Sequence, residues 1–109
     1  MNVRLYVWQR LTAAAIAPLV LVHLIVIFYA THKGLRAADI LARTHGSLAW
    51  ALFYCVFVAA IAVHASIGIR TVLSEWSPLG ARQRDLAVMF FGLVLAMLGL
   101  RAVAAVVLS

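Results

Sequence analysis

The residues that could do chemistry gather in one stretch, which begins inside an uncharged run and continues past its end. His64 stands one helical turn before Gly68, and Arg70 and the pair Glu75-Trp76 follow. Residues four apart share a helix face, so the glycine leaves space beside the histidine for a flat ring. Histidine is also a common ligand of haem iron. The order of these residues therefore predicts a haem ligand, room for the porphyrin and a cation for a haem propionate.

A second histidine, His23, lies near the middle of an earlier uncharged run, residues 11–31. Placing an ionisable side chain inside a membrane span costs free energy, so such residues usually have a function. Three roles are open for His23: it binds a second haem, it pairs with His64 on one haem, or it only makes a hydrogen bond. For His64 the alternative to a haem ligand is a hydrogen bond between helices. The candidate haem-binding residues are His64, Gly68, Arg70 and His23.

Polar residues at the edges of the apolar runs are candidates for a quinone site. Tyrosine and tryptophan near cations, as in the first ten residues, are typical of the headgroup layer. Glu75 with the indole of Trp76 at the same depth could hold a quinone carbonyl and help deliver protons to it. The alternative for this acid is a surface ion pair with Arg82 or Arg84. The candidate quinone-binding residues are Gln9, Arg10, Thr12, Glu75 and Trp76.

The composition makes lipid the solvent for most of the chain. Of the 109 residues, 67% are hydrophobic and 11% are charged, and the mean hydropathy is +1.10. A small soluble domain has too much surface for its volume to bury so many apolar side chains. We expect one transmembrane anchor domain over residues 1–109. The single cysteine, Cys55, excludes an intrachain disulfide.

The net charge of +6 fits a membrane edge better than a nucleic-acid partner. The nine Lys and Arg residues are scattered between apolar runs and form no basic stripe with interleaved aromatic residues. As membrane anchors they divide five against four between the two sides, and the excess predicts an N-terminus in the cytoplasm. The larger group is Arg4, Arg10, Arg70, Arg82 and Arg84, and the smaller is Lys33, Arg36, Arg43 and Arg101.

Three apolar runs are each long enough to cross a hydrocarbon core of about 30 Å as a helix. We expect helices at about residues 4–31, 46–74 and 83–108, with a short surface helix around residues 35–41. Pro18 should kink the first span, because it removes a backbone donor and crowds the preceding turn. Gly92, Ala96 and Gly99 share one face of the third span and permit close helix contact. The sequence thus predicts an all-α membrane protein with three transmembrane helices.

These motifs, in this order, resemble those of the haem b membrane-anchor subunits of succinate dehydrogenase and fumarate reductase (respiratory complex II). The resemblance covers nearly the whole chain. His64-x-x-x-Gly68-Ile69-Arg70 is similar to the cytochrome b anchor motif in which the histidine binds haem. In that motif a second histidine usually follows the arginine, and here the position is Thr71.

Two further stretches carry the resemblance with substitutions. Gln9-Arg10-Leu11-Thr12 looks like the family's His-Arg-x-Ser/Thr lead-in, whose arginine lies at the quinone site. Here Gln9 replaces the histidine and Tyr6 replaces an upstream quinone-contacting serine. Downstream, an acid followed by an indole stands where the smaller anchor subunit has an acid followed by a quinone-binding tyrosine, and where the cytochrome b subunit has an aspartate. The chain therefore combines features of both anchor types.

The resemblance implies a membrane-anchor subunit of a succinate:quinone oxidoreductase in the bacterial inner membrane. Such a subunit carries no catalytic residue of its own, binds haem b and forms part of the quinone site. Electrons would pass from a flavoprotein partner through an iron-sulfur partner to quinone. A second membrane-anchor subunit would supply the other axial histidine, so the three helices would form half of an anchor bundle. Lipid surrounds such a bundle, and no nucleic acid is involved.

Three other classes of protein compete with this interpretation. A diheme b-type subunit of another membrane dehydrogenase would carry two histidine pairs, whereas only His23 and His64 lie within the spans. A small drug or ion transporter would need an acidic residue in the middle of a span and usually four helices, and the sequence shows neither. A cofactor-free assembly anchor is the third.

Overall fold

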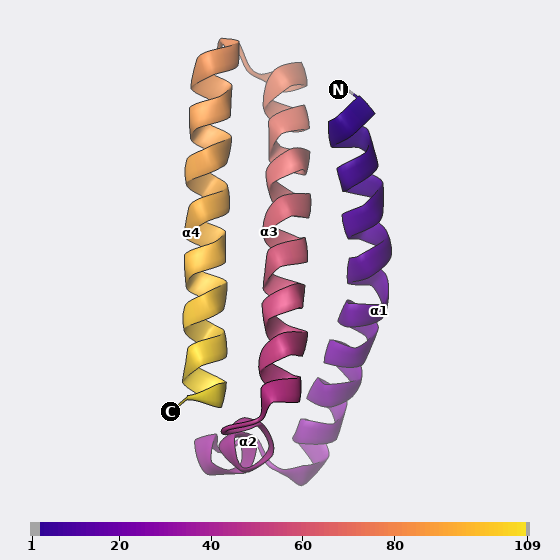
Figure 1. Cartoon of the computed structure of the whole chain (residues 1–109), viewed down its shortest axis with the longest axis vertical. Coiled ribbons are helices and arrows are strands. Elements are labelled where there is room, and N and C mark those ends of the chain that lie inside the picture. The colour runs from indigo at the N-terminus through magenta and orange to yellow at the C-terminus, as the bar shows by residue number, and fades with distance from the viewer. Residues whose placement is uncertain (1–2, 109) are drawn as a thin grey trace.

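The computed structural model describes residues 3–108, and almost all of them are α-helical (Figure 1). The helices are α1 (Val3–Lys33), α2 (Ala37–Thr44), α3 (Leu48–Trp76) and α4 (Ala81–Val107). Of these, α1, α3 and α4 are long and apolar enough to cross a membrane. The structure thus confirms the predicted all-α membrane protein with three candidate spans. The surface helix in the polar loop also exists, although it begins and ends later than predicted.

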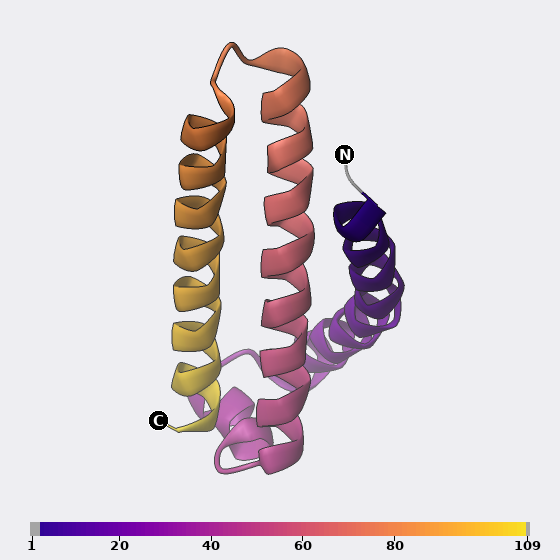
Figure 2. The ribbon, with the colours of Figure 1, turned by 45° about the horizontal axis from the view of Figure 1, so that its top comes forward.

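The middle position in the bundle belongs to α3, which packs against α1 on one side and α4 on the other (Figures 1 and 2). In the view of Figure 1 the chain runs down, up and down, so the start of α1, the end of α3 and the start of α4 meet at one end of the bundle. The short α2 lies at the other end, beside the end of α4. Most large apolar side chains face outwards, as the 68% exposed Phe28 and 72% exposed Phe90 illustrate. Lipid is the solvent that such surfaces require.

Proline lies in the interior of α1, yet the helix continues through it. Pro18 cannot donate a backbone hydrogen bond, which frees the carbonyl of Ala14 one turn earlier. Figure 1 shows α1 bowed along its length rather than straight, and proline is one of the few identifiable causes of helix bending. The bent helix, α1, carries several of the candidate site residues in its N-terminal half.

Glycines allow α3 and α4 to approach closely at two levels. A Cβ atom added to Gly92 would lie 2.6 Å from Ser66 Oγ, and one added to Gly99 would lie 2.5 Å from Val58 Cγ1. Both distances are too short for real Cβ contacts: at Gly92 the Ser66 hydroxyl would have to turn aside, and at Gly99 the stiff side chain of Val58 would have to move. This confirms the close helix contact that small residues on this face of the third span predict.

The loop between α2 and α3 is fastened to the last turn of α4. Thr44 Oγ1 donates to Val106 O at 2.5 Å, and the backbone N–H of Gly46 donates to Val107 O at 2.8 Å. Gly46 has φ +69°, a left-handed conformation that glycine adopts without strain. The last carbonyls of a helix have no partner within the helix, so these two donors satisfy groups that would otherwise be orphaned.

Candidate functional site

The contact between α1 and α3 contains a hydrogen bond to the principal candidate ligand. His64 Nδ1 lies 3.2 Å from Thr12 Oγ1, although the two residues are 52 positions apart in the sequence. Thr12 is buried, with 7% of its surface exposed. Its hydroxyl also lies 2.7 Å from Trp8 O and 3.1 Å from Gln9 O, which are carbonyls of the preceding turn of α1.

Gly68 and Gln9 meet one turn farther along the same contact. A Cβ atom added to Gly68 would lie 3.7 Å from Gln9 Nε2, an ordinary van der Waals distance. The other end of this amide, Gln9 Oε1, is buried and accepts no hydrogen bond from any described residue. The structure therefore brings together residues that the sequence divided between two sites. Gln9 and Thr12 were predicted to bind quinone, but they lie beside the two residues that were predicted to bind haem.

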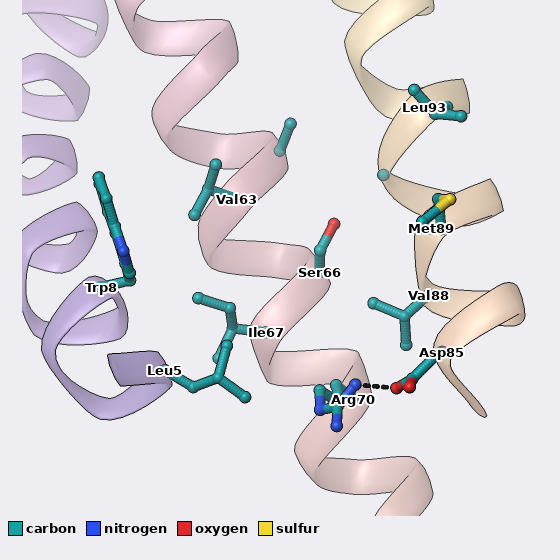
Figure 3. Close-up of a pocket in the computed structure, with 12 residues that line it drawn as sticks. Leu5, Trp8, Val63, Ser66, Ile67, Arg70, Asp85, Val88, Met89 and Leu93 are labelled. Carbon is teal, nitrogen blue, oxygen red and sulfur yellow. Dashed lines mark hydrogen bonds and ion pairs between the residues drawn. The ribbon is translucent and has the colours of Figure 1, made fainter. Parts of the chain in front are cut away.

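Arg70 makes a contact that the sequence did not predict. Its guanidinium is ion-paired with the carboxylate of Asp85 at the start of α4 (Figure 3). A guanidinium has five N–H donors, so one carboxylate leaves donors for a second anion. Asp85 was not among the candidate site residues, and its only signal in the sequence is that it is the one acid near the start of the third apolar run.

An apolar groove of about 690 Å³ runs along α3 beside this ion pair. Trp8 of α1 forms one wall and Met89 and Leu93 of α4 form the other, while Val63 and Ser66 form the floor (Figure 3). His64 is not among the lining residues. The groove and the histidine therefore occupy different sides of α3, and Arg70 belongs to the groove side.

The quinone candidates that remain are exposed and share one end of the bundle. Arg10 lies near the start of α1, with its guanidinium 5.8 Å from the centre of the Tyr6 ring. Glu75 and Trp76 are the last two residues of α3, and Trp76 is 84% exposed. Among residues 3–108 no ion pair or hydrogen bond joins Glu75 to an arginine, so the surface ion pair that competed with a quinone role for this acid does not form. Nor does an ion pair or a cation–ring contact join Arg10 to Glu75 or Trp76 within this part of the chain.

His23 lies at a different level of the bundle from His64. Its ring stands edge-on to Tyr54 and Phe57, at centroid distances of 5.9 and 5.3 Å. His64 is level with Thr12, and His23 follows about 16 Å farther along α1 at about 1.5 Å per residue. This separation along the bundle does not favour one haem shared by His23 and His64 of one chain.

The surroundings of His23 are compatible both with a ligand of a second haem and with a simple hydrogen-bonding residue. Its Nδ1 atom is buried and has no hydrogen-bond partner among the described residues. The ring borders a cavity of about 290 Å³, which residues of α2, α3 and α4 also line. Thr44 and Tyr54 contribute the polar side chains of this cavity.

The fold and the polar contact between its helices define a small multi-pass membrane protein with a histidine inside a span. The chain belongs to the family of succinate dehydrogenase/fumarate reductase transmembrane subunits, whose family model matches residues 1–104. This match confirms the resemblance drawn from the motifs. No curated protein and no solved structure matches the chain.

Proposed function

We propose that the chain is a haem b-binding membrane-anchor subunit of a succinate:quinone oxidoreductase. The hydrogen bond between helices that was the alternative role for His64 does form, but it involves only Nδ1, and the nitrogen that it leaves for a ligand is the observation that carries this proposal. A neutral imidazole that donates from Nδ1 keeps its lone pair on Nε2, and ligands of metals are usually held in this way. When bound, haem would supply one-electron transfer. Gly68 lies on the same face as His64, and the side chain of Gln9 packs over it, with Nε2 3.7 Å from the Cβ position.

Quinone would bind at the end of the bundle where α1 begins and α3 ends. Arg10 and the indole of Trp76 would donate hydrogen bonds to the quinone carbonyls. Glu75 would carry protons to the carbonyl oxygens as two electrons arrive. Gln9, whose Oε1 is buried without a hydrogen-bond partner in residues 3–108, would lie between this edge and His64.

The other subunits would complete both sites. A second membrane-anchor subunit would supply the second axial ligand, because this chain offers one histidine at that level. The iron-sulfur and flavoprotein subunits would dock at the end of the bundle that carries the larger group of cations. That end would face the cytoplasm of a bacterial cell, with the anchor in the inner membrane.

The experiment that tests the proposal is a reduced-minus-oxidised spectrum of the intact complex, purified through a tag on this chain. We expect a b-type absorption band that is lost when His64 is replaced by alanine. A complex without b-type absorption would contradict the haem assignment. Haem that survives His64→Ala in full amount would show that another residue binds the iron.

A further inference from the structure

We propose that Thr12 is a positioning residue for His64, and that its hydroxyl selects the imidazole tautomer that can ligate iron. The inference rests on the proposed haem-binding function. The sequence placed Thr12 in the quinone site, whereas the structure buries its hydroxyl against the histidine of the neighbouring helix.

The direction of the hydrogen bond follows from counting hydrogens. A threonine hydroxyl has one hydrogen and two lone pairs. Two carbonyl oxygens of α1 compete for that hydrogen, Trp8 O at 2.7 Å and Gln9 O at 3.1 Å, and neither can donate. The hydrogen therefore points back into α1. His64 Nδ1, at 3.2 Å from the same oxygen, then donates its N–H to a lone pair of the hydroxyl.

This arrangement sets both the chemistry and the orientation of the imidazole. With the proton on Nδ1, the lone pair of the neutral ring is on Nε2, which is the atom left free to bind a metal. Because the hydroxyl is tied to the backbone of α1, it also limits rotation of the ring about its side-chain bonds. A hydrogen bond accepted from the far ring nitrogen makes a histidine a stronger electron donor to its metal. Thr12 would thus tune the iron although it does not touch it.

The test compares three variants of the intact complex. Thr12→Val keeps the shape of the side chain but removes the oxygen that accepts from His64. We expect haem affinity to fall by about 10- to 100-fold, the usual effect of losing such a partner. We also expect the midpoint potential of the remaining haem to rise, since a weaker donor stabilises the oxidised iron less. Thr12→Ser, which keeps the hydroxyl, should restore both values.

Thr71→Val is the matched control. The Thr71 hydroxyl also donates to a carbonyl one turn earlier, Ile67 O at 3.0 Å, but it contacts no histidine among the described residues. We expect this variant to keep the haem affinity and the midpoint potential of the unmodified complex. If Thr12→Val fails to assemble, the smaller Thr12→Ala replaces it, with the same two shifts expected.

The outcomes separate this inference from the function on which it rests. An assembled Thr12→Val complex with unchanged haem affinity and unchanged potential would overturn the role of Thr12 and leave the haem assignment intact. The same holds if Thr12→Ser behaves like Thr12→Val, because then the hydroxyl is not what matters. Absence of b-type absorption in the unmodified complex would overturn both.

Discussion

Asp85 and Arg70 form an ion pair that joins the start of α4 to the end of α3. The pair lies at the end of the bundle where α1 also begins, and it borders the groove between α1 and α4. Arg70 thus links two spans and also lies close to the candidate sites. Replacing its partner, Asp85, tests whether the ion pair holds α3 and α4 together.

Asp85→Asn should weaken the contact between α3 and α4 slightly. Both side chains are substantially exposed, so we expect a loss of no more than about 1 kcal/mol in the free energy of unfolding. The measurement is the thermal inactivation midpoint of the purified complex. Asp39→Asn is the control, because Asp39 pairs with Arg36 only three residues away and joins no two spans. Equal effects of the two variants would mean that the Asp85 pair does not hold the spans together.

Gly99→Ala should destabilise the bundle by overpacking. The added Cβ would lie 2.5 Å from Val58 Cγ1, and a β-branched side chain in a helix has little freedom to move aside. We expect a cost of about 1–3 kcal/mol, measured as reduced thermal stability in detergent. Val58→Ala in the same chain should restore most of it.

Gly80→Ala is the control for Gly99→Ala. Its Cβ would lie 3.9 Å from Gln83 Oε1 and its φ is −69°, so alanine fits there. If Gly99→Ala proved as mild as Gly80→Ala, α3 and α4 would not be packed as closely as the structure describes.

His23→Phe distinguishes one haem from two. Phenylalanine keeps an aromatic ring against Tyr54 and Phe57 but has no nitrogen to bind iron. We expect the haem content per complex to stay unchanged, because the proposed ligand is His64. The measurement is the pyridine haemochrome content of the purified complex. Loss of half of the haem would instead establish a second haem at His23, whose buried Nδ1 has no hydrogen-bond partner among the described residues.

Arg10→Ala and Glu75→Gln should slow quinone reduction by up to about 100-fold, as expected when a proton-transferring or orienting group is lost. Electron transfer to a soluble acceptor should stay normal, because that route bypasses the quinone. Arg43→Ala is a matched control for Arg10→Ala. Arg43 also lies over a tyrosine, 5.4 Å from the centre of the Tyr29 ring, but at the other end of the bundle. Equal losses in both assays would place these residues outside the quinone site.

Patterns local to each span were enough to predict the helices. Charge-free runs predicted three of them, because a membrane helix needs about 20 apolar residues whatever it packs against. The spacing of His64 and Gly68 predicted that they share a face, since both lie on one helix. The glycines of the third span likewise predicted a close contact, though not that Val58 and Ser66 would occupy it.

Contacts between spans could not be predicted, because they depend on how far one helix slides and turns relative to another. Thr12 meets His64 across 52 positions, and Arg70 meets Asp85 across 15. For Arg70 the sequence suggested a haem propionate or a place at the membrane edge, but not an acid on the next span. For Thr12 its place beside Arg10 suggested quinone, and only the packing of α1 on α3 moves it to the histidine.

The fastening of the loop between α2 and α3 to the end of α4 bears on how the protein is made. The donors, Thr44 and Gly46, are synthesised long before their acceptors, Val106 and Val107. Until those acceptors exist, the Thr44 hydroxyl can donate only within its own helix, to Ile40 O at 3.1 Å, and the Gly46 N–H lacks its acceptor on α4. They can close onto their acceptors only after the last span has entered the bilayer. The end of the bundle that carries α2 is therefore the last part to fold. A chain truncated before residue 106 would lack the carbonyls to which this loop is bound.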